Sequence, residues 1–542
     1  MKFYTFLLIA VSLSLAACGG GSAPAPNPIP TFTIGGTVTN LAGMGGGLQL
    51  QDDGTDALLV NANGSFTFAT ALPSRSVYNV TVFRQPSSPA QTCAVTQADG
   101  VATANVTSVA VDCGHNEWTW IGGSNVGDQK GTYGTQGMAA AANIPGARAH
   151  FASWTDASGN FWLFGGFGWD STGTLAAMND LWKYSGGQWT WMGGSNVGNQ
   201  LGTYGTQGMA AATNIPGARQ GAVAWTDAAG NVWLFGGFAG TSNYFNDLWK
   251  YSAGQWTWMG GSNLVNQPGI YGTQGIAAMT NIPGARENAV TWTDAAGNFW
   301  FFGGDGYDSA GTTLGELNDL WKYSGGQWTW IGGSNMVNKP GTYGTQGTPA
   351  SGNVPGARTV PTTWTDASGN FWLFGGLGYD SAGTTLGYLN DLWKYSGGQW
   401  TWMGGSNVVN QPGIYGTLSM PAPGNVPGAR GRGAAVTRTD AAGNFWLFGG
   451  AGYDSAGTNG FLNDLWKHSG GQWTWMGGSN VVNQKGTYGI QGTPAPGNVP
   501  GARRFSVFWI DASGNFWLFG GRGYDSTGTT LGQLNDLWKY EP

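Results

Sequence analysis

A unit of about 70 residues occurs six times after residue 117, and it constrains the fold more than any other feature of the sequence. Each copy contains the tetrapeptide Pro-Gly-Ala-Arg, which ends at Arg148, Arg219, Arg286, Arg358, Arg430 and Arg503. Because one repeat cannot bury its apolar face alone, neighbouring copies must stack and share a core. The sequence therefore predicts a repeat architecture for this part of the chain.

Each unit predicts four short strands. In the first unit these are Phe151-Ala-Ser-Trp, Phe161-Trp-Leu-Phe-Gly-Gly, Asn179-Asp-Leu-Trp-Lys-Tyr and Trp189-Thr-Trp. The second strand is apolar at consecutive positions, so both faces of its sheet must be buried, whereas a half-exposed strand would alternate. All 30 tryptophans follow residue 117. Packing between sheets is therefore expected to be largely tryptophan.

These strands resemble the kelch repeat, in which an apolar strand ends in Gly-Gly and a Trp strand precedes Pro-x-x-Arg. The resemblance covers residues 115–542 and implies an all-β, six-bladed kelch-like β-propeller with four-stranded antiparallel blades. A Trp-Thr-Trp strand precedes the first Pro-Gly-Ala-Arg, and the last unit ends at Tyr540 without one. Residues 117–123 must therefore complete the last sheet and close the ring.

The connections between strands are expected to differ in length. Those from the second to the third strand and from the fourth strand to the next unit are expected to be long, roughly 12 and 20 residues. In an antiparallel sheet both emerge on the same face. That face, the mouth of the ring, is where we expect function.

The N-terminus predicts export and anchoring. Residues 1–17 carry Lys2 and then an apolar stretch too short to span a bilayer. The end of this segment, Leu15-Ala-Ala-Cys18, resembles the lipobox of bacterial lipoproteins, which implies acylation of Cys18 and attachment to a lipid bilayer. The alternative is an ordinary signal peptide cut after Ala17. Residues 18–30 are expected to form a Gly- and Pro-rich tether. By resemblance to lipoprotein sorting in enterobacteria, Gly19 in place of Asp implies the outer membrane, with the protein periplasmic or surface-exposed.

Residues 31–114 alternate with the period of strands and predict a small immunoglobulin-like or prealbumin-like sandwich preceding the propeller. Two cysteines of this module, Cys93 and Cys113, are expected to form a disulfide because the chain is exported. Two buried free thiols are the alternative. We expect the module to act as a spacer.

Composition excludes several function classes. The net charge is −6 and no run of Lys or Arg occurs, which argues against nucleic acid as a partner. Kelch-like propellers include copper oxidases, which need a Tyr–Cys cross-link and two His ligands. Here no Cys follows Cys113, and the three histidines, His115, His150 and His468, are far apart in sequence. No catalytic residue, metal or cofactor is therefore predicted, while a carboxylate-based hydrolase or sugar isomerase stays open.

Residues repeated in all six units are better explained by structure than by function. An Asp before Leu-Trp recurs and is expected to cap a turn, as is the Asp of Asp-x-x-Gly-Asn. Residues that break the symmetry near the mouth are better site candidates, and neutral drift among copies is the alternative. They predict a shallow pocket lined by His150, Phe167, Trp169, Phe238, Glu287, Asp305, Arg432, Arg504 and Arg522.

Two functions follow from these expectations. The first is a monomeric propeller that acts as a protein-binding scaffold for an unidentified envelope protein. The second is a glycan-binding surface, because a Tyr beside amide side chains recurs at Tyr133, Tyr204, Tyr271, Tyr343, Tyr415 and Tyr488. Aromatic platforms of this kind bind sugars, and six copies would give avidity. The same tyrosines could instead fix the long connections.

Overall fold

The computed structural model describes residues 28–41, 47–87, 91–114, 116–431, 434–435, 439–440, 442–529 and 531–542. Within these ranges the chain forms strands and turns, and no helix in them could cross a membrane. The predicted signal segment, most of the predicted tether, Cys18, His115 and Arg432 lie outside the described residues.

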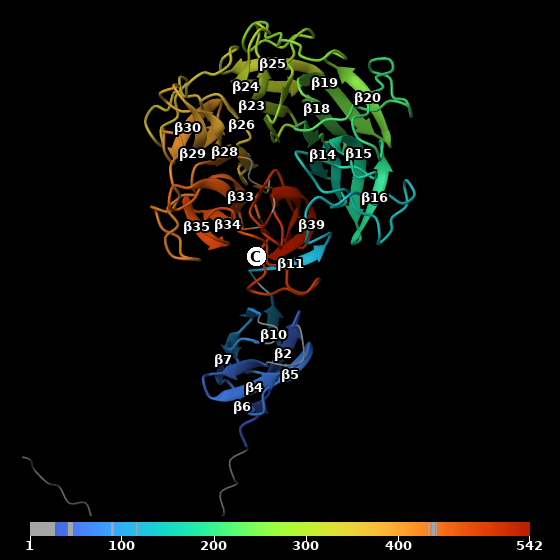
Figure 1. The fold of residues 1–542 in the computed structure, drawn as a ribbon. Coiled ribbons are helices and arrows are strands. Elements are labelled where there is room, and N and C mark those ends of the chain that lie inside the picture. Colours follow the sequence, from blue (N-terminus) through green and yellow to red (C-terminus); the bar gives the residue numbers. More distant parts are fainter. Residues whose placement is uncertain are drawn as a thin grey trace, which may run out of the picture.

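The N-terminal module contains ten strands in two four-stranded sheets and one two-stranded sheet (Figure 1). The sheets have the strand orders β5-β2-β10-β8, β4-β3-β7-β9 and β1-β6. The bounds are β1 (Thr31–Phe32), β2 (Ile34–Thr39), β3 (Leu48–Asp52), β4 (Asp56–Val60), β5 (Gly64–Thr67), β6 (Leu72–Pro73), β7 (Val77–Arg84), β8 (Cys93–Thr96), β9 (Asp99–Val101) and β10 (Val106–Cys113).

Alternation places the apolar residues of this module on one side of each sheet. In β3 the side chains of Leu48 and Leu50 are buried, and they share one core with Ile34 and Val111 from the other sheet. The predicted disulfide is confirmed, since Cys93 of β8 is bonded to Cys113 of β10. It ties the last strands of the module together.

Six sheets of one pattern follow, and each is antiparallel. The first sheet contains β12 (Arg148–Ala149), β13 (Ala152–Thr155), β14 (Phe161–Trp169), β15 (Leu175–Ser185) and β16 (Gln188–Gly193). The second contains β17 (Val223–Thr226), β18 (Val232–Ala239), β19 (Asn243–Ser252) and β20 (Gln255–Gly260). The third contains β21 (Arg286–Glu287), β22 (Val290–Thr293), β23 (Phe299–Tyr307), β24 (Leu314–Ser324) and β25 (Gln327–Gly332).

The remaining sheets repeat this order. The fourth contains β26 (Arg358–Thr359), β27 (Thr362–Thr365), β28 (Phe371–Tyr379), β29 (Leu386–Ser396) and β30 (Gln399–Gly404). The fifth contains β31 (Arg430–Gly431), β32 (Ala434–Ala435), β33 (Phe445–Tyr453), β34 (Asn459–Ser469) and β35 (Gln472–Gly477). The sixth contains β36 (Arg503–Arg504), β37 (Val507–Ile510), β38 (Phe516–Tyr524), β39 (Leu531–Glu541) and β11 (Glu117–Gly122).

The sheets are arranged around a ring that fits a β-propeller, with β16 and β30 on the outside and β14 and β28 nearer the middle (Figure 1). The predicted closure is confirmed, because β11 pairs with β39 through Trp118↔Tyr540 and Trp120↔Trp538. The first strand of the repeat region therefore completes the last sheet.

Aromatic side chains fill the space between neighbouring sheets. Six clusters of buried residues each join two consecutive sheets, and one of them joins the sixth sheet to the first. In that cluster the ring of Phe161 stacks on Trp509 at a centroid distance of 4.0 Å. The ring of sheets is thus closed by packing as well as by strand pairing.

The Gly-Gly pair of each second strand is a β-bulge within the strand and not its end. Gly165 and Gly166 have φ angles of 67° and 95°, and a Cβ on Gly165 would lie 2.8 Å from two carbonyl oxygens. After the bulge β14 continues to Trp169 and pairs with β15. The expected connection of roughly 12 residues is therefore wrong, and only residues 170–174 join the two strands.

The long connections from one sheet to the next pack on the outer strands. In the connection 123–147 the N–H of Gly137 donates to Trp191 O (2.8 Å) and Asn143 Nδ2 donates to Trp189 O (3.2 Å). Equivalent bonds recur at the other sheets. The connections thereby cover the outer edges, which would otherwise present unpaired backbone groups.

A candidate binding site at the mouth of the ring

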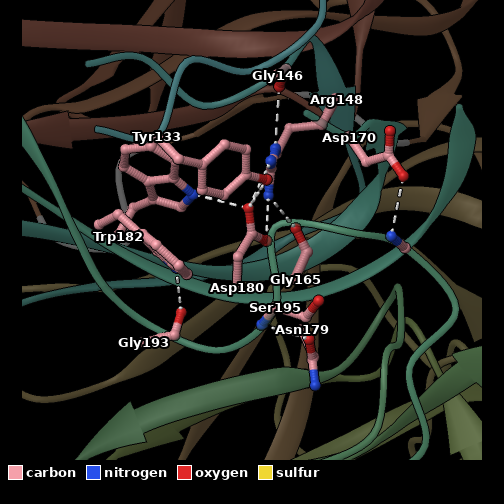
Figure 2. Close-up of polar contacts among 12 residues, drawn as sticks. Tyr133, Gly146, Arg148, Gly165, Asp170, Asn179, Asp180, Trp182, Gly193 and Ser195 are labelled. Carbon is pink, nitrogen blue, oxygen red and sulfur yellow. Dashed lines mark hydrogen bonds and ion pairs between the residues drawn. The ribbon is translucent and has the colours of Figure 1, made fainter. Parts of the chain in front are cut away.

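A buried ion pair lies in the inner part of the first sheet (Figure 2). Arg148 donates from Nη1 to Asp180 Oδ1 (2.6 Å) and from Nη2 to Asp180 Oδ2 (2.8 Å), and both side chains are fully buried. Arg148 also donates to the carbonyl oxygens of Gly146 and Gly165. Tyr133 and Trp182 each donate to Asp180 Oδ2, at 2.6 and 2.7 Å. Every charged atom in the cluster is thus hydrogen-bonded.

The same ion pair occurs in all six sheets. The other five pairs are Arg219–Asp247, Arg286–Asp319, Arg358–Asp391, Arg430–Asp464 and Arg503–Asp536, each at 2.6 Å. Burial opposes the charge on Arg148, but Asp180 outweighs it and raises the arginine pKa above its ordinary value. The expected turn-capping role of the repeated Asp is wrong, because its carboxylate is the buried partner of the Pro-Gly-Ala-Arg arginine.

The repeated tyrosines are part of this cluster and not of a surface. Tyr133 is buried, and its hydroxyl donates to Asp180; burial, together with that carboxylate, raises its pKa. The five equivalent tyrosines make the same bond to the equivalent Asp. The predicted glycan platform is therefore wrong at these positions, and the tyrosines fix the long connections instead.

The Asp of Asp-x-x-Gly-Asn caps a hairpin turn as predicted. Asp156 accepts bonds from the backbone N–H groups of Ser158 and Asn160 and from Trp162 Nε1. Burial raises the pKa of Asp156, but the bonds from Trp162 and Asn160 outweigh it and leave that pKa below its ordinary value.

The six sheets differ where the strands continue beyond the bulge. There one residue from each of the first, second and third strands lies directly opposite its partner in the neighbouring strand, and we call these three residues a row. In sheet order the rows are Ala149–Phe167–Ala177, Gln220–Phe238–Tyr244, Glu287–Asp305–Glu316, Thr359–Leu377–Tyr388, Gly431–Ala451–Phe461 and Arg504–Arg522–Gln533. The third sheet thus carries three carboxyl groups and the sixth carries two guanidinium groups, so these rows break the symmetry of the ring.

A cavity of about 440 Å³ opens over the row of the first sheet. It is bounded on one side by the second sheet and on the other by the sixth. Its lining consists of Ala149, His150, Phe167, Leu175, Ala176, Ala177, Asn199, Gln220, Phe238, Ala239, Gly240, Thr241, Arg504, Arg522 and Gln533. The set combines phenyl rings, amides and two arginines.

Small side chains of the first sheet create this cavity. The second sheet fills the equivalent space with Tyr244, whose hydroxyl reaches Asp305 Oδ2 of the third sheet (3.0 Å). The first sheet has Ala177 at that register, so nothing equivalent extends from it toward Phe238. The second-to-third connection of the second sheet is also short, residues 240–242, which lowers the rim there.

Five of the nine predicted mouth residues line the cavity, namely His150, Phe167, Phe238, Arg504 and Arg522. Trp169 does not, since its Nε1 donates to Asp128 Oδ1 (2.8 Å) and ties the first sheet to the preceding connection. Asp305 and Glu287 do not line the cavity either. The Asp305 carboxylate accepts a hydrogen bond from the Tyr244 hydroxyl, and Glu287 pairs with Asp305 in the third sheet and lies over Gly221. The predicted pocket that joined all nine residues is therefore wrong in its extent.

Gln533 and Ala177 line the cavity but were absent from the predicted set. Both lie in third strands, whose contribution was hidden by the mistaken end of the strand at Gly-Gly. One sequence signal could have located the site. This signal is the number of residues between the Gly-Gly pair and the Trp of Leu-Trp. The segment is shorter in the second repeat, where it runs from Phe238 to Trp249, than in the other repeats, where it runs for example from Phe167 to Trp182.

Backbone hydrogen bonds connect the inner strands below the row. The N–H of Gly221 donates to His150 O (2.8 Å), Asn288 to Gly221 O (2.8 Å) and Val360 to Asn288 O (3.1 Å). These residues all have positive φ angles, which turn the strand at this point. The arrangement links the starts of the inner strands in the first four sheets, including the cavity wall formed by the first and second sheets.

The long connections also expose a repeated apolar residue on the mouth face. The residue after each Ser-Asn is apolar and between 39% and 64% exposed, at Val126, Val197, Leu264, Met336, Val408 and Val481. In each copy the backbone N–H of this residue donates to the preceding Ser Oγ. We call these six residues the apolar belt.

No group of three or more His, Cys, Asp and Glu side chains in the described part of the chain is arranged to hold a metal ion.

Comparisons with known proteins give a remote likeness in structure and none in sequence. No family model and no curated protein matches the chain. Similar solved structures include YjhT, with 12% identity over 73% of this chain and 95% of that one and a TM-score of 0.42. A Bacteroides thetaiotaomicron protein of unknown function has 11% identity over 96% of this chain and 99% of that one, with a TM-score of 0.42. A fungal alcohol oxidase of the AA5 family, in complex with copper, has 15% identity over 73% and 63%, with a TM-score of 0.37.

Proposed function

We propose that the chain is a lipid-anchored protein of the bacterial cell envelope. In this proposal its six-bladed kelch-like propeller is a non-catalytic scaffold that binds another envelope protein. The apolar belt is the observation that carries the proposal. An exposed apolar residue alone is ordinary, but this one recurs at the same position of all six connections and adds nothing to the buried clusters.

The belt is suited to a protein partner. Each of its side chains is presented by a turn that a Ser hydroxyl fixes, so little conformational entropy is lost on contact. Six equivalent contacts on one face would add their effects, as linked binding sites do. Long connections on a rigid scaffold are also the usual place for recognition.

A binding role is favoured over chemistry by the residues that line the cavity. The cavity lining contains no carboxylate, thiol or lysine among the described residues, and His150 is its one imidazole. General acid–base catalysis usually pairs such groups within hydrogen-bond reach of a substrate.

Sequence features outside the described residues support the location. The segment Leu15-Ala-Ala-Cys18 resembles a lipobox, and a Gly- and Pro-rich tether follows it. The Cys93–Cys113 disulfide suits an oxidising compartment. Labelling cells with a clickable fatty acid tests the anchor: we expect label on the wild type and none on Cys18→Ser. Label that persists in the variant would contradict it.

Cross-linking in native envelopes tests the scaffold. A variant with all six belt residues changed to Ser should retain the thermal transition of the wild type and lose its cross-linked protein partner. Arg522→Ala, which leaves the belt intact, serves as the control and should retain the partner. A partner that survives the belt substitutions would refute the assignment of the belt.

A further inference from the structure

We propose that the cavity over the first sheet binds a small aromatic carboxylate that also carries a hydrogen-bond donor. This inference is independent of the belt and of the protein partner. It rests on the charge, the shape and one buried acceptor of the cavity.

The sixth-sheet wall of the cavity is positively charged. Arg504 and Arg522 occupy the same row, and no Asp or Glu lines the cavity within the described residues. The side chain of Arg522 is exposed and makes no ion pair or hydrogen bond with any described residue. The guanidinium of Arg504 lies over Phe461, 4.9 Å from the ring centroid, which orients it. Arginine matches a carboxylate in geometry and charge, so this wall suits an anionic group.

Two aromatic rings dominate the opposite side of the cavity, beside the polar side chains of Gln220 and Thr241 from the second sheet. Phe167 and Phe238 occupy the same position in neighbouring sheets, and both are half-buried. Leu175 and Ala177 also line this side. A flat apolar body would bury surface against the two rings while its carboxylate faced the arginines.

Gln533 adds a polar requirement. This residue lines the cavity and is 6% exposed, and its side-chain Oε1 is buried with no hydrogen-bond partner among the described residues. A buried carbonyl oxygen of this kind is costly unless a donor reaches it. The ligand therefore has an O–H or N–H group in addition to its carboxylate. The cavity volume of about 440 Å³ is within the range of small-molecule sites.

The matched probes are 4-hydroxyphenylacetate and its neutral amide, 4-hydroxyphenylacetamide, titrated calorimetrically into the full chain in detergent. Probes of this size are expected to bind in the millimolar range. We expect the acid to bind and the amide to bind at least about 10-fold more weakly, because only the acid brings a negative charge to the guanidinium of Arg522. Raising the salt concentration should weaken binding of the acid.

Variants taken from the protein's own repeats locate the site. Ala177→Tyr introduces the residue that the second and fourth sheets carry at this register, and it should fill the cavity and abolish binding. Arg522→Gln should reduce the affinity for the acid at least about 10-fold and leave the affinity for the amide unchanged. Tyr388→Ala, across the mouth at the same register as Ala177, is the control and should bind like the wild type.

Three results would overturn the proposal. They are no binding of the acid at millimolar concentrations, equal binding of acid and amide, and wild-type binding by an Ala177→Tyr variant with an unchanged thermal midpoint. None of them bears on the scaffold, whose test uses the belt residues. Loss of the cross-linked partner in the belt variant, together with wild-type binding of 4-hydroxyphenylacetate, would show that the two sites are separate.

Discussion

At the scale of single residues, burial decides what a charged side chain does in this protein. Six arginines are buried against aspartates inside the sheets, whereas Arg522 is exposed at the mouth. A buried charge must be paired to be tolerated, so the six buried arginines are held by their aspartate partners and have a structural role. The exposed arginine has little effect on stability and is free to take a ligand.

Removing one partner of a buried pair tests this contrast. Asp391→Ala leaves Arg358 buried without its carboxylate and takes an acceptor from Tyr343 and Trp393. We expect a loss of about 3–5 kcal/mol in the free energy of unfolding, measured by urea denaturation. The control Arg522→Ala should change it by less than about 0.5 kcal/mol. Equal denaturation midpoints for the two variants would contradict the structural role of the pair.

His468 predicts a pH dependence of stability. It lies in β34 where the other sheets have tyrosine, among the rings of Trp364, Trp372 and Trp473. Burial lowers its pKa from 6.5 to about 4. The unfolded chain therefore takes up a proton below pH 6.5 that the native protein takes up only near pH 4. The stability is complete above pH 6.5 and is lost as the pH falls toward 4, by about 3 kcal/mol.

The variant His468→Tyr isolates this contribution, because all carboxylates are common to both proteins and their effects cancel. Unfolding free energies measured between pH 7.5 and pH 4.5 should diverge on acidification, with the variant losing less. Parallel curves for the two proteins would show that His468 does not titrate as described.

At the scale of elements, the sequence predicts the strands better than their ends. The repeat, the buried second strand and the closing role of residues 117–123 are visible in local patterns, since apolar runs and copy number report directly on packing. The ends of the strands are not visible in such patterns, because a Gly-Gly pair often marks the end of a strand and here forms a bulge within one. The Arg148–Asp180 pair is equally hidden, since its members are in different strands and only the fold brings them together.

Strand β11 offers the sharpest test at this scale. Deleting residues 117–123 exposes the edge of β39, from Leu537 to Glu541, which pairs with β11 in the native protein. An open edge of this kind pairs with other chains. We expect a lower thermal midpoint and a shift from monomer to oligomer in size-exclusion chromatography with light scattering. A chain that starts at residue 116 retains β11 and should stay monomeric. A monomer with the wild-type midpoint after the deletion would refute the closure.

At the scale of the whole molecule, the N-terminal module and the ring have separate cores. The cluster around Ile34, Leu48 and Val111 contains no residue of the repeat sheets. The two parts meet through polar contacts that include the bond from Thr92 N–H of the module to the Glu117 carboxylate of the ring. Each part should therefore unfold as its own cooperative unit.

The disulfide separates these two units experimentally. It closes a loop between residues 20 positions apart, and loop-closure entropy gives it about 3 kcal/mol. Replacing Cys93 and Cys113 by Ala should lower the calorimetric transition of the module by more than about 10 °C, because a domain of this size shifts several degrees per kcal/mol. The transition of the repeat sheets should not move. A reductant should reproduce the shift in the wild type and leave the double variant unchanged. Movement of both transitions together would mean that the module and the ring unfold as one unit, and that the polar bonds between them couple the two cores.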